Sequence, residues 1–189
     1  MIDIEERELL YPREAPLRAW RLFRVRPSGE SFVLSSPMYH DPEPPPWLQV
    51  GSKACCYEGH PAPAPGCRCG IYPAIQGTLD SLPGYLLDTV HDRDPSAYAE
   101  VACSGRVFVD MRGVRAERAR ILRLALSESV WPDERALRAA RRLLGERYQV
   151  PVGGLREVPA WVTENRRDQG PPPDAVDLGL DLDKLDLWV

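Results

Sequence analysis

Most of the side chains able to do chemistry in this chain lie in one short stretch. Four of the five cysteines and one of the three histidines fall between Cys55 and Cys69. Zinc prefers a tetrahedral set of cysteine thiolates and histidine imidazoles, and a structural zinc site has all four positions filled. The spacing C-x3-H-x6-C-x-C supplies such a set with short intervening loops. The predicted metal ligands are therefore Cys56, His60, Cys67 and Cys69.

The first ligand position has two candidates, because Cys55 precedes Cys56 directly. Neighbouring side chains of an extended segment point in opposite directions, and we favour Cys56. A metal-free loop of reduced thiols and a redox-active Cys67/Cys69 pair remain alternative interpretations. A catalytic zinc is disfavoured, since four protein ligands leave no open position for water. The predicted cofactor is a structural zinc ion, held in what we call the Cys/His knot, residues 55–70.

The elements expected to position this knot are mostly strands. Two apolar runs, residues 17–26 and 31–36, flank a turn that contains Gly29, which predicts a β-hairpin. Residues 98–111 form the clearest strand candidate, with a bulge or bend expected at Gly105. In its second half Val107, Val109 and Met111 alternate with Arg106, Phe108 and Asp110. Residues 115–126 fit a strand or a helix, and a turn at Arg112-Gly113 favours the strand.

One helix is expected toward the C-terminus, over residues 132–148. Pro132 suits a first helical turn, acidic residues follow it, and Gly145 lies near the end. Residues 78–90 predict one or two further short helical turns. The fold class is therefore α+β: a mostly antiparallel β domain, either a small barrel or a sandwich, with one longer helix.

Composition predicts one globular domain with appendages. Residues 1–16 form a charged N-terminal lead, 17–169 the domain, and 170–189 a proline-rich linker with an extended acidic tail. The chain is 28% charged, and no apolar run approaches the ~20 residues that span a bilayer. Its N-terminus lacks the features of a signal peptide. We therefore expect a cytoplasmic protein without a membrane partner, in which thiols stay reduced.

The knot and the strands after it resemble a known group of proteins. His60-x-Ala-Pro-x-x-Gly-Cys67-x-Cys69-Gly-Ile-Tyr72 is followed by Gly105-x-Val-x-Val-Asp and by Gly113-Val-Arg115-Ala-Glu117-x-Ala119. This pattern is similar to that of small uncharacterised proteins of high-G+C Gram-positive bacteria, and it spans residues 17–126. The resemblance supports the four ligands and implies no activity.

Two sets of charged residues suggest other chemistry. Arg115 and Glu117 together suggest an enzyme, with the arginine binding an anion and the glutamate acting as a base, although cross-strand ion pairs are the simpler interpretation. A second set, on the predicted helix, forms a positive surface that could contact nucleic acid. The candidate anion contacts are Arg115, Arg135, Arg138 and Arg142.

The C-terminal tail predicts a docking peptide. Residues 174–189 contain five aspartates and one lysine, with leucines at alternate positions. Such a segment has no core of its own, but it can place alternate apolar side chains in a partner's groove. Leu185-Asp186-Leu187-Trp188 resembles the bacterial sliding-clamp-binding peptide, QLDLF or QLSLF, with Lys184 in place of the glutamine. The resemblance implies that these four residues contact a clamp.

These observations favour a non-enzymatic binding or adaptor protein. It would carry a structural zinc site and dock through its tail on a protein partner, either the sliding clamp or another DNA-maintenance assembly of replication or repair. The alternative is a nucleic-acid-binding or nucleic-acid-processing protein that uses the arginine-rich helix. An enzyme centred on Arg115 and Glu117 is the third hypothesis.

Overall fold

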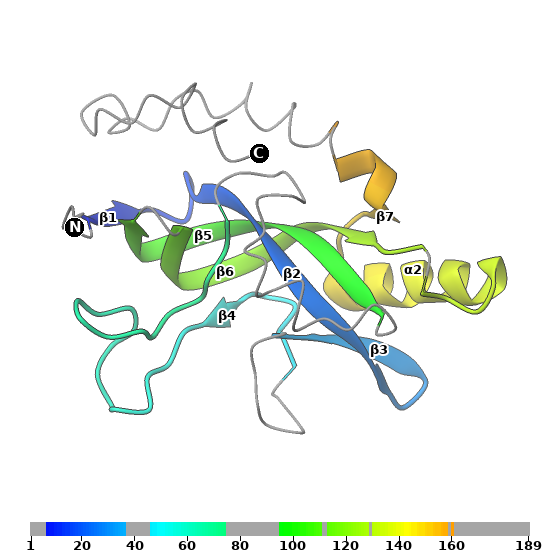
Figure 1. The fold of residues 1–189 in the computed structure, drawn as a ribbon, viewed down its shortest axis with the longest axis horizontal. Helices are drawn as coiled ribbons and strands as arrows, with labels where there is room; N and C mark the ends of the chain where they lie inside the picture. Colours follow the sequence, from blue (N-terminus) through cyan, green and yellow to red (C-terminus); the bar gives the residue numbers. More distant parts are fainter. Residues whose placement is uncertain are drawn as a thin grey trace, which may run out of the picture.

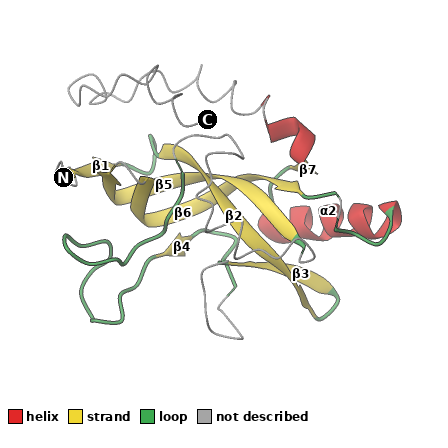
Figure 2. Ribbon diagram, viewed as in Figure 1, coloured by secondary structure: helices red, strands yellow, loops and turns green. Residues whose placement is uncertain are grey.

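The structure, a computed structural model, describes residues 7–36, 46–74, 95–110, 113–128, 130–158 and 160 (Figure 1). These residues form a seven-stranded sheet in the order β3-β2-β5-β6-β4, with β1 added to β5 and β7 added to β6. All pairings are antiparallel except that of β6 with β7 (Figure 2). The strands are β1 (Arg7–Tyr11), β2 (Leu17–Ser28), β3 (Ser31–Ser35), β4 (Ser52–Lys53), β5 (Ser96–Asp110), β6 (Gly113–Leu126) and β7 (Val152–Gly154). The predicted mostly antiparallel β domain is confirmed.

The predicted N-terminal hairpin is present as β2 and β3. The two strands pair from Arg24 with Ser35 to Ser28 with Ser31, so the loop is reduced to Gly29 and Glu30. Gly29 has a φ of 59°, in the left-handed region that glycine enters without steric cost.

The centre of the sheet is the long hairpin of β5 and β6. Residues 115–126 lie in β6, which confirms the strand interpretation over the helix. The register shifts twice along this pair, and the second shift, between Ser104 and Val107, contains the bulge expected at Gly105. Gly105 has a φ of 80°, and a Cβ there would lie 2.6 Å from a carboxylate oxygen of Glu117. The positive φ favours glycine here, and a larger residue would also displace the Glu117 side chain.

The helix α2 (Glu134–Tyr148) confirms the predicted helix and begins two residues later than expected. Asp133 caps its N-terminus by accepting a hydrogen bond of 2.7 Å from the backbone N–H of Ala136. The apolar side of α2 is buried in the main core and packs on β3 and β7. Its last residue, Tyr148, accepts a hydrogen bond from Leu34 N (2.8 Å) and donates one to Trp47 O (3.3 Å). The helix end is thereby attached to the β-hairpin.

Apolar side chains pack on both faces of the sheet. The main core lies on the face covered by α2, and it includes Phe23, Leu34 and Leu124. A smaller cluster lies on the other face around Trp20 and Tyr98, whose rings stack with centroids 5.3 Å apart. Successive side chains of a strand point to opposite faces, so the same strands contribute to two separate apolar regions.

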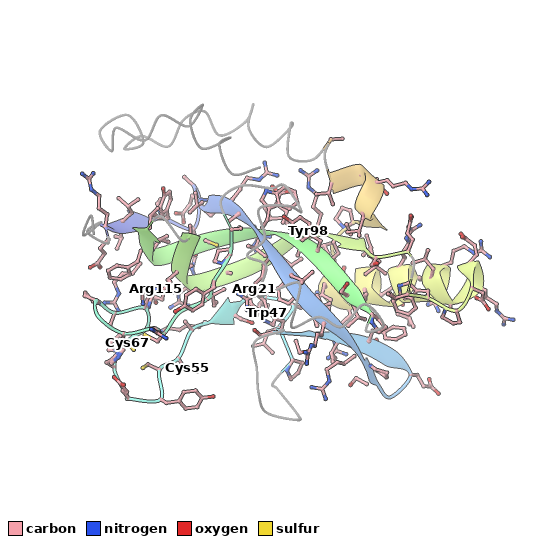
Figure 3. The ribbon with its side chains drawn as sticks, in the orientation of Figure 1. Arg21, Trp47, Cys55, Cys67, Tyr98 and Arg115 are labelled. Atoms are coloured by element: carbon pink, nitrogen blue, oxygen red, sulfur yellow. The ribbon has the colours of Figure 1, made fainter. Side chains whose placement is uncertain are left out.

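A short segment after the knot joins two distant edges of the sheet. Ile71 pairs with Ala116 on the outer edge of β6, and Ala74 pairs with Trp20 on the outer edge of β2. Arg21 is buried and lies near Trp47 (Figure 3). Its Nη1 donates a hydrogen bond of 2.6 Å to the carbonyl of Tyr72. Because β2 and β6 flank β5 on opposite sides, residues 71–74 curl the sheet into a half-barrel.

The remaining predictions concern the ends and the loops. Residues 7–11 of the predicted N-terminal lead form β1, which pairs with residues 105–109 of β5. The helical turns predicted at residues 78–90 and the tail at 170–189 lie outside the described residues. No helix within the described ranges has the length and apolar character needed to cross a membrane.

Candidate metal centre

The four predicted ligands come together at one point. One ligand atom from each of Cys56, His60, Cys67 and Cys69 lies within 4.8 Å of all the others. Cys56 Sγ is 3.2 Å from His60 Nε2 and 3.7 Å from Cys67 Sγ, and Cys69 Sγ is 4.0 Å from His60 Nδ1. The separation of the Cys56 and Cys67 sulfurs exceeds a disulfide bond, and all five cysteines of the chain are free thiols. The group can hold a metal ion, and the exposed Cys55 is not part of it.

Two tight turns bring these side chains together. The backbone N–H of Gly59 donates to Cys56 O at 3.1 Å, which places His60 next to Cys56. The N–H of Cys67 donates to Ala64 O at 3.3 Å, with Gly66 in the third position of that turn at a φ of 70°. A positive φ at this position is typical of a type II turn and favours glycine. The proline-rich spacer therefore ends in a turn that presents Cys67.

The knot leaves and rejoins the sheet at two adjacent residues of β6. Ala54 N donates to Glu117 O at 2.7 Å just before the knot, and Ile71 N donates to Ala116 O at 2.9 Å just after it. Immediately before Ala54, β4 pairs with Ala119 and Arg118. Both ends of the loop are thus held on the same edge of the same strand.

Arg115 of β6 contacts the knot from the side of the sheet. Its guanidinium donates to the carbonyls of Ala64 (3.3 Å), Cys67 and Cys69 (3.0 Å), and its side chain is only 8% exposed (Figure 3). The guanidinium carbon also lies 5.1 Å from the centre of the Phe108 ring, at a distance suited to a cation–π contact. The structure therefore places this predicted anion contact inside the protein, on backbone carbonyls that include those of two ligand residues.

Local hydrogen bonds set the electrostatics of the ligands. The carbonyl of Pro61, 3.2 Å from Nδ1, raises the pKa of His60, to which the Cys67 thiol and the Glu58 carboxylate also contribute. A hydrogen bond from that ring N–H to Pro61 O leaves the lone pair of Nε2 free for a metal. The Cys69 backbone lowers the pKa of the Cys67 thiol, whereas burial raises that of Cys69 to about 11. Metal binding by these thiols requires them to lose protons.

Glu117 lies outside the metal centre. Its carboxylate accepts a hydrogen bond from Arg106 N at 3.2 Å and lies 3.8 Å from Lys53 Nζ and 3.4 Å from Arg118 Nε. The contact with Lys53 of β4 is a cross-strand ion pair, whereas Arg118 follows Glu117 directly in β6. Arg115 is turned toward the knot instead.

The candidate anion contacts on α2 are mostly paired with acidic residues. Arg138 lies 3.2 Å from Glu134, and Arg142 lies 3.0 Å from Glu146, each one helical turn away. Arg135 is exposed on the same helix. Because neighbouring carboxylates offset two of the three positive charges, the helix surface is less basic than its arginine count suggests.

A buried ion cluster was not identified from the sequence. Glu100 is fully buried, and its two carboxylate oxygens pair with Arg18 Nε at 2.5 Å and with Arg123 Nε. The three residues come from β5, β2 and β6, so this cluster joins the three central strands. The only signal in the sequence is a single carboxylate inside the apolar run 97–103.

The predicted partner-binding residues Leu185, Asp186, Leu187 and Trp188 lie outside the described residues. Comparison of the chain with protein-family models, with curated proteins and with solved structures gives no match.

Proposed function

We propose that the Cys/His knot binds zinc as a structural cofactor, in a protein that works by binding rather than by catalysis. A tetrahedral zinc with Zn–S bonds of about 2.3 Å and a Zn–N bond of about 2.0 Å places sulfurs ~3.8 Å apart and sulfur and nitrogen ~3.5 Å apart. The separations of 3.7 Å between Cys56 and Cys67 and of 3.2 Å between Cys56 and His60 support this fit. Three thiolates and one imidazole favour zinc over magnesium or calcium, which take oxygen ligands.

The observation that carries a structural role is the way the knot is built into the sheet. Both its ends are bonded to adjacent residues of β6, and Arg115 binds three of its carbonyls. A metal ion at this point would cross-link a long loop that has few apolar residues of its own. All four ligand positions come from the protein, which leaves none for a reacting water.

Metal analysis of the purified protein tests this proposal. We expect one zinc per chain, and we expect Cys56→Ser to lose both the metal and the cooperative unfolding transition. Cys55→Ser is the matched control, because it removes an exposed neighbouring thiol, and it should keep one zinc and the wild-type melting temperature. A Cys56→Ser protein that remains folded and still binds one zinc would refute the assignment of this ligand.

We further propose that the protein is a cytoplasmic adaptor that docks through its tail on the sliding clamp or on another DNA-maintenance assembly. The support is the segment Leu185–Trp188, which follows a triple-proline linker and alternates leucine with aspartate. The pairing of Arg138 and Arg142 with glutamates also makes the helix a weaker candidate for nucleic-acid contact.

Titration of the full chain against purified sliding clamp tests the docking proposal. Leu187→Ala together with Trp188→Ala should reduce affinity at least tenfold, because these side chains would fill the apolar pocket. Leu178→Ala with Leu180→Ala, in the same tail but outside the motif, is the control and should bind within about twofold of wild type. Equal affinity of both double variants would remove the clamp from consideration.

A further inference from the structure

A shallow groove lies where β4, β5 and β6 meet the turn before β2. It has a volume of about 360 Å³, and its described lining residues include four cationic side chains and no carboxylate. The cations are Arg13, Lys53, Arg118 and Arg120. The groove is therefore positively charged, and none of its described lining residues belongs to the Cys/His knot or to α2.

The sheet register explains the shape of this groove. Arg118 lies opposite Ser104 and Arg120 opposite Ala102 on β5. These two β5 side chains are small and line the groove, as does Ser52 of β4. The small side chains leave a hollow beside the long ones. The arginines of β6 lie on one side of this hollow, and Lys53 of β4 lies on another.

The charges of the groove are only partly offset. Glu117 lies 3.8 Å from Lys53 and 3.4 Å from Arg118, so one carboxylate is shared between two of the cations. Arg13 and Arg120 are exposed, as is Lys53. The surface remains positive although the whole chain has a formal charge of −4.

We propose that this groove binds the phosphate backbone of a nucleic acid. Arg118 and Arg120 are two residues apart on one strand, so they lie on one face about 6.8 Å apart. This separation is close to that of successive phosphates along a nucleic-acid strand. Exposed arginine and lysine side chains bind phosphates mainly through charge, with release of counterions. No aromatic side chain is among the described lining residues, so the groove contacts the backbone rather than stacked bases.

A polymer fits the groove better than a small phosphate ester. Arg13, Lys53 and Arg120 are exposed and Arg118 is half-buried, so none is held in a fully buried position that would bind one phosphate tightly. Several exposed charges bind weakly one at a time and gain affinity together on a polyanion. This proposal goes beyond the docking function and is independent of it, because the tail and the groove are separate segments that can be mutated separately.

Fluorescence anisotropy with the full zinc-loaded chain tests the proposal. The probes are labelled single-stranded and double-stranded 20-mers of DNA, measured between 50 and 200 mM salt, about the range in which phosphate contacts are lost. Arg118→Ala with Arg120→Ala should reduce affinity about tenfold or more at the lowest salt, and it should lower the salt slope by about 1.5 to 2. Arg118→Lys with Arg120→Lys should keep affinity within about threefold.

The matched control is Arg138→Ala with Arg142→Ala, which removes the same charge from α2. It should bind DNA within about twofold of wild type, and circular dichroism should show that all variants are folded. Equal losses in the groove and helix variants would overturn the proposal, because they would reflect net charge alone. Saturation of the groove by inorganic phosphate or a nucleoside monophosphate without binding of the 20-mers would also overturn it. So would tighter binding of a synthetic acidic peptide, residues 174–189, than of DNA.

Discussion

Replacement of Arg115 by alanine tests whether its contacts with the knot support the metal centre. Its guanidinium donates to the carbonyls of Ala64, Cys67 and Cys69. A hydrogen bond to a charged group contributes about 1.5–3 kcal/mol when it is buried. The three acceptor residues are half-buried, so water partly replaces the lost donors, and we take ~1 kcal/mol for each. Arg115→Ala should therefore reduce the free energy of unfolding by about 3 kcal/mol.

For a chain of this length that loss corresponds to a melting temperature lower by roughly 6–12 °C. The effect should also reach the metal, since residues that orient ligands typically change metal affinity by about 10–100-fold. Thermal unfolding with zinc present measures the first quantity, and competition with a chromophoric chelator measures the second. Arg115→Lys keeps the positive charge but lacks the planar guanidinium with its several donors. It should therefore recover only part of the thermal stability and part of the zinc affinity.

The control is Arg120→Ala, which removes an exposed arginine from the same strand. It should change the free energy of unfolding by no more than about 0.5 kcal/mol. If Arg115→Ala behaves like this control in both assays, then the carbonyl contacts do not support the knot, and the structural interpretation of the metal centre loses its main observation.

Three further predictions concern other buried groups. Glu100→Gln leaves two arginines beside a neutral side chain, and urea unfolding should show a loss of about 3–5 kcal/mol. Tyr148→Phe leaves the buried Leu34 N–H without its acceptor and should cost ~1–3 kcal/mol with an unchanged urea dependence. With zinc bound, iodoacetamide at pH 8 should label the exposed Cys55. Cys103 should react only after unfolding, because burial raises its pKa to about 12 and keeps it protonated; labelling of Cys103 in the native protein would contradict its buried position.

The parts of the fold that repeat a local pattern could be predicted from the sequence. The hairpin at residues 17–36 shows two apolar runs around a glycine turn, the second half of the strand 98–111 alternates with a period of 2, and the helix of Leu137 and Leu144 follows a period of 3.6 residues. The strand β1 could not be predicted in this way. It is only five residues long, Leu10 is 78% exposed, and only Leu9 and Tyr11 are half-buried, so the alternating pattern is too short to identify a strand. The strand forms because β5 is long enough to pair with both β2 and β1.

In the candidate site, too, only the residues that form a local sequence pattern could be predicted. Metal binding requires cysteine or histidine side chains, and in this loop they are closely spaced. The set of Cys56, His60, Cys67 and Cys69 could therefore be identified from the sequence. Arg115 supports the knot through backbone carbonyls, which any residue type supplies, so nothing in the knot sequence points to it. Glu100 meets Arg18 and Arg123 only through strand pairing across three strands. Such long-range partners leave no local pattern.

Residues 71–74 have a consequence for self-association. An unpaired strand edge presents a row of N–H and C=O groups on which another chain can add a strand, and such edges promote aggregation. Ile71 and Ala74 cover part of the outer edges of β6 and β2, and both lie within five residues after Cys69, the last cysteine of the knot. Loss of the metal would loosen this cover and expose both edges at once. We therefore expect the protein to form β-rich oligomers after chelation of the metal, detectable by light scattering. The metal-bound knot would then prevent self-association in addition to holding its own loop in place.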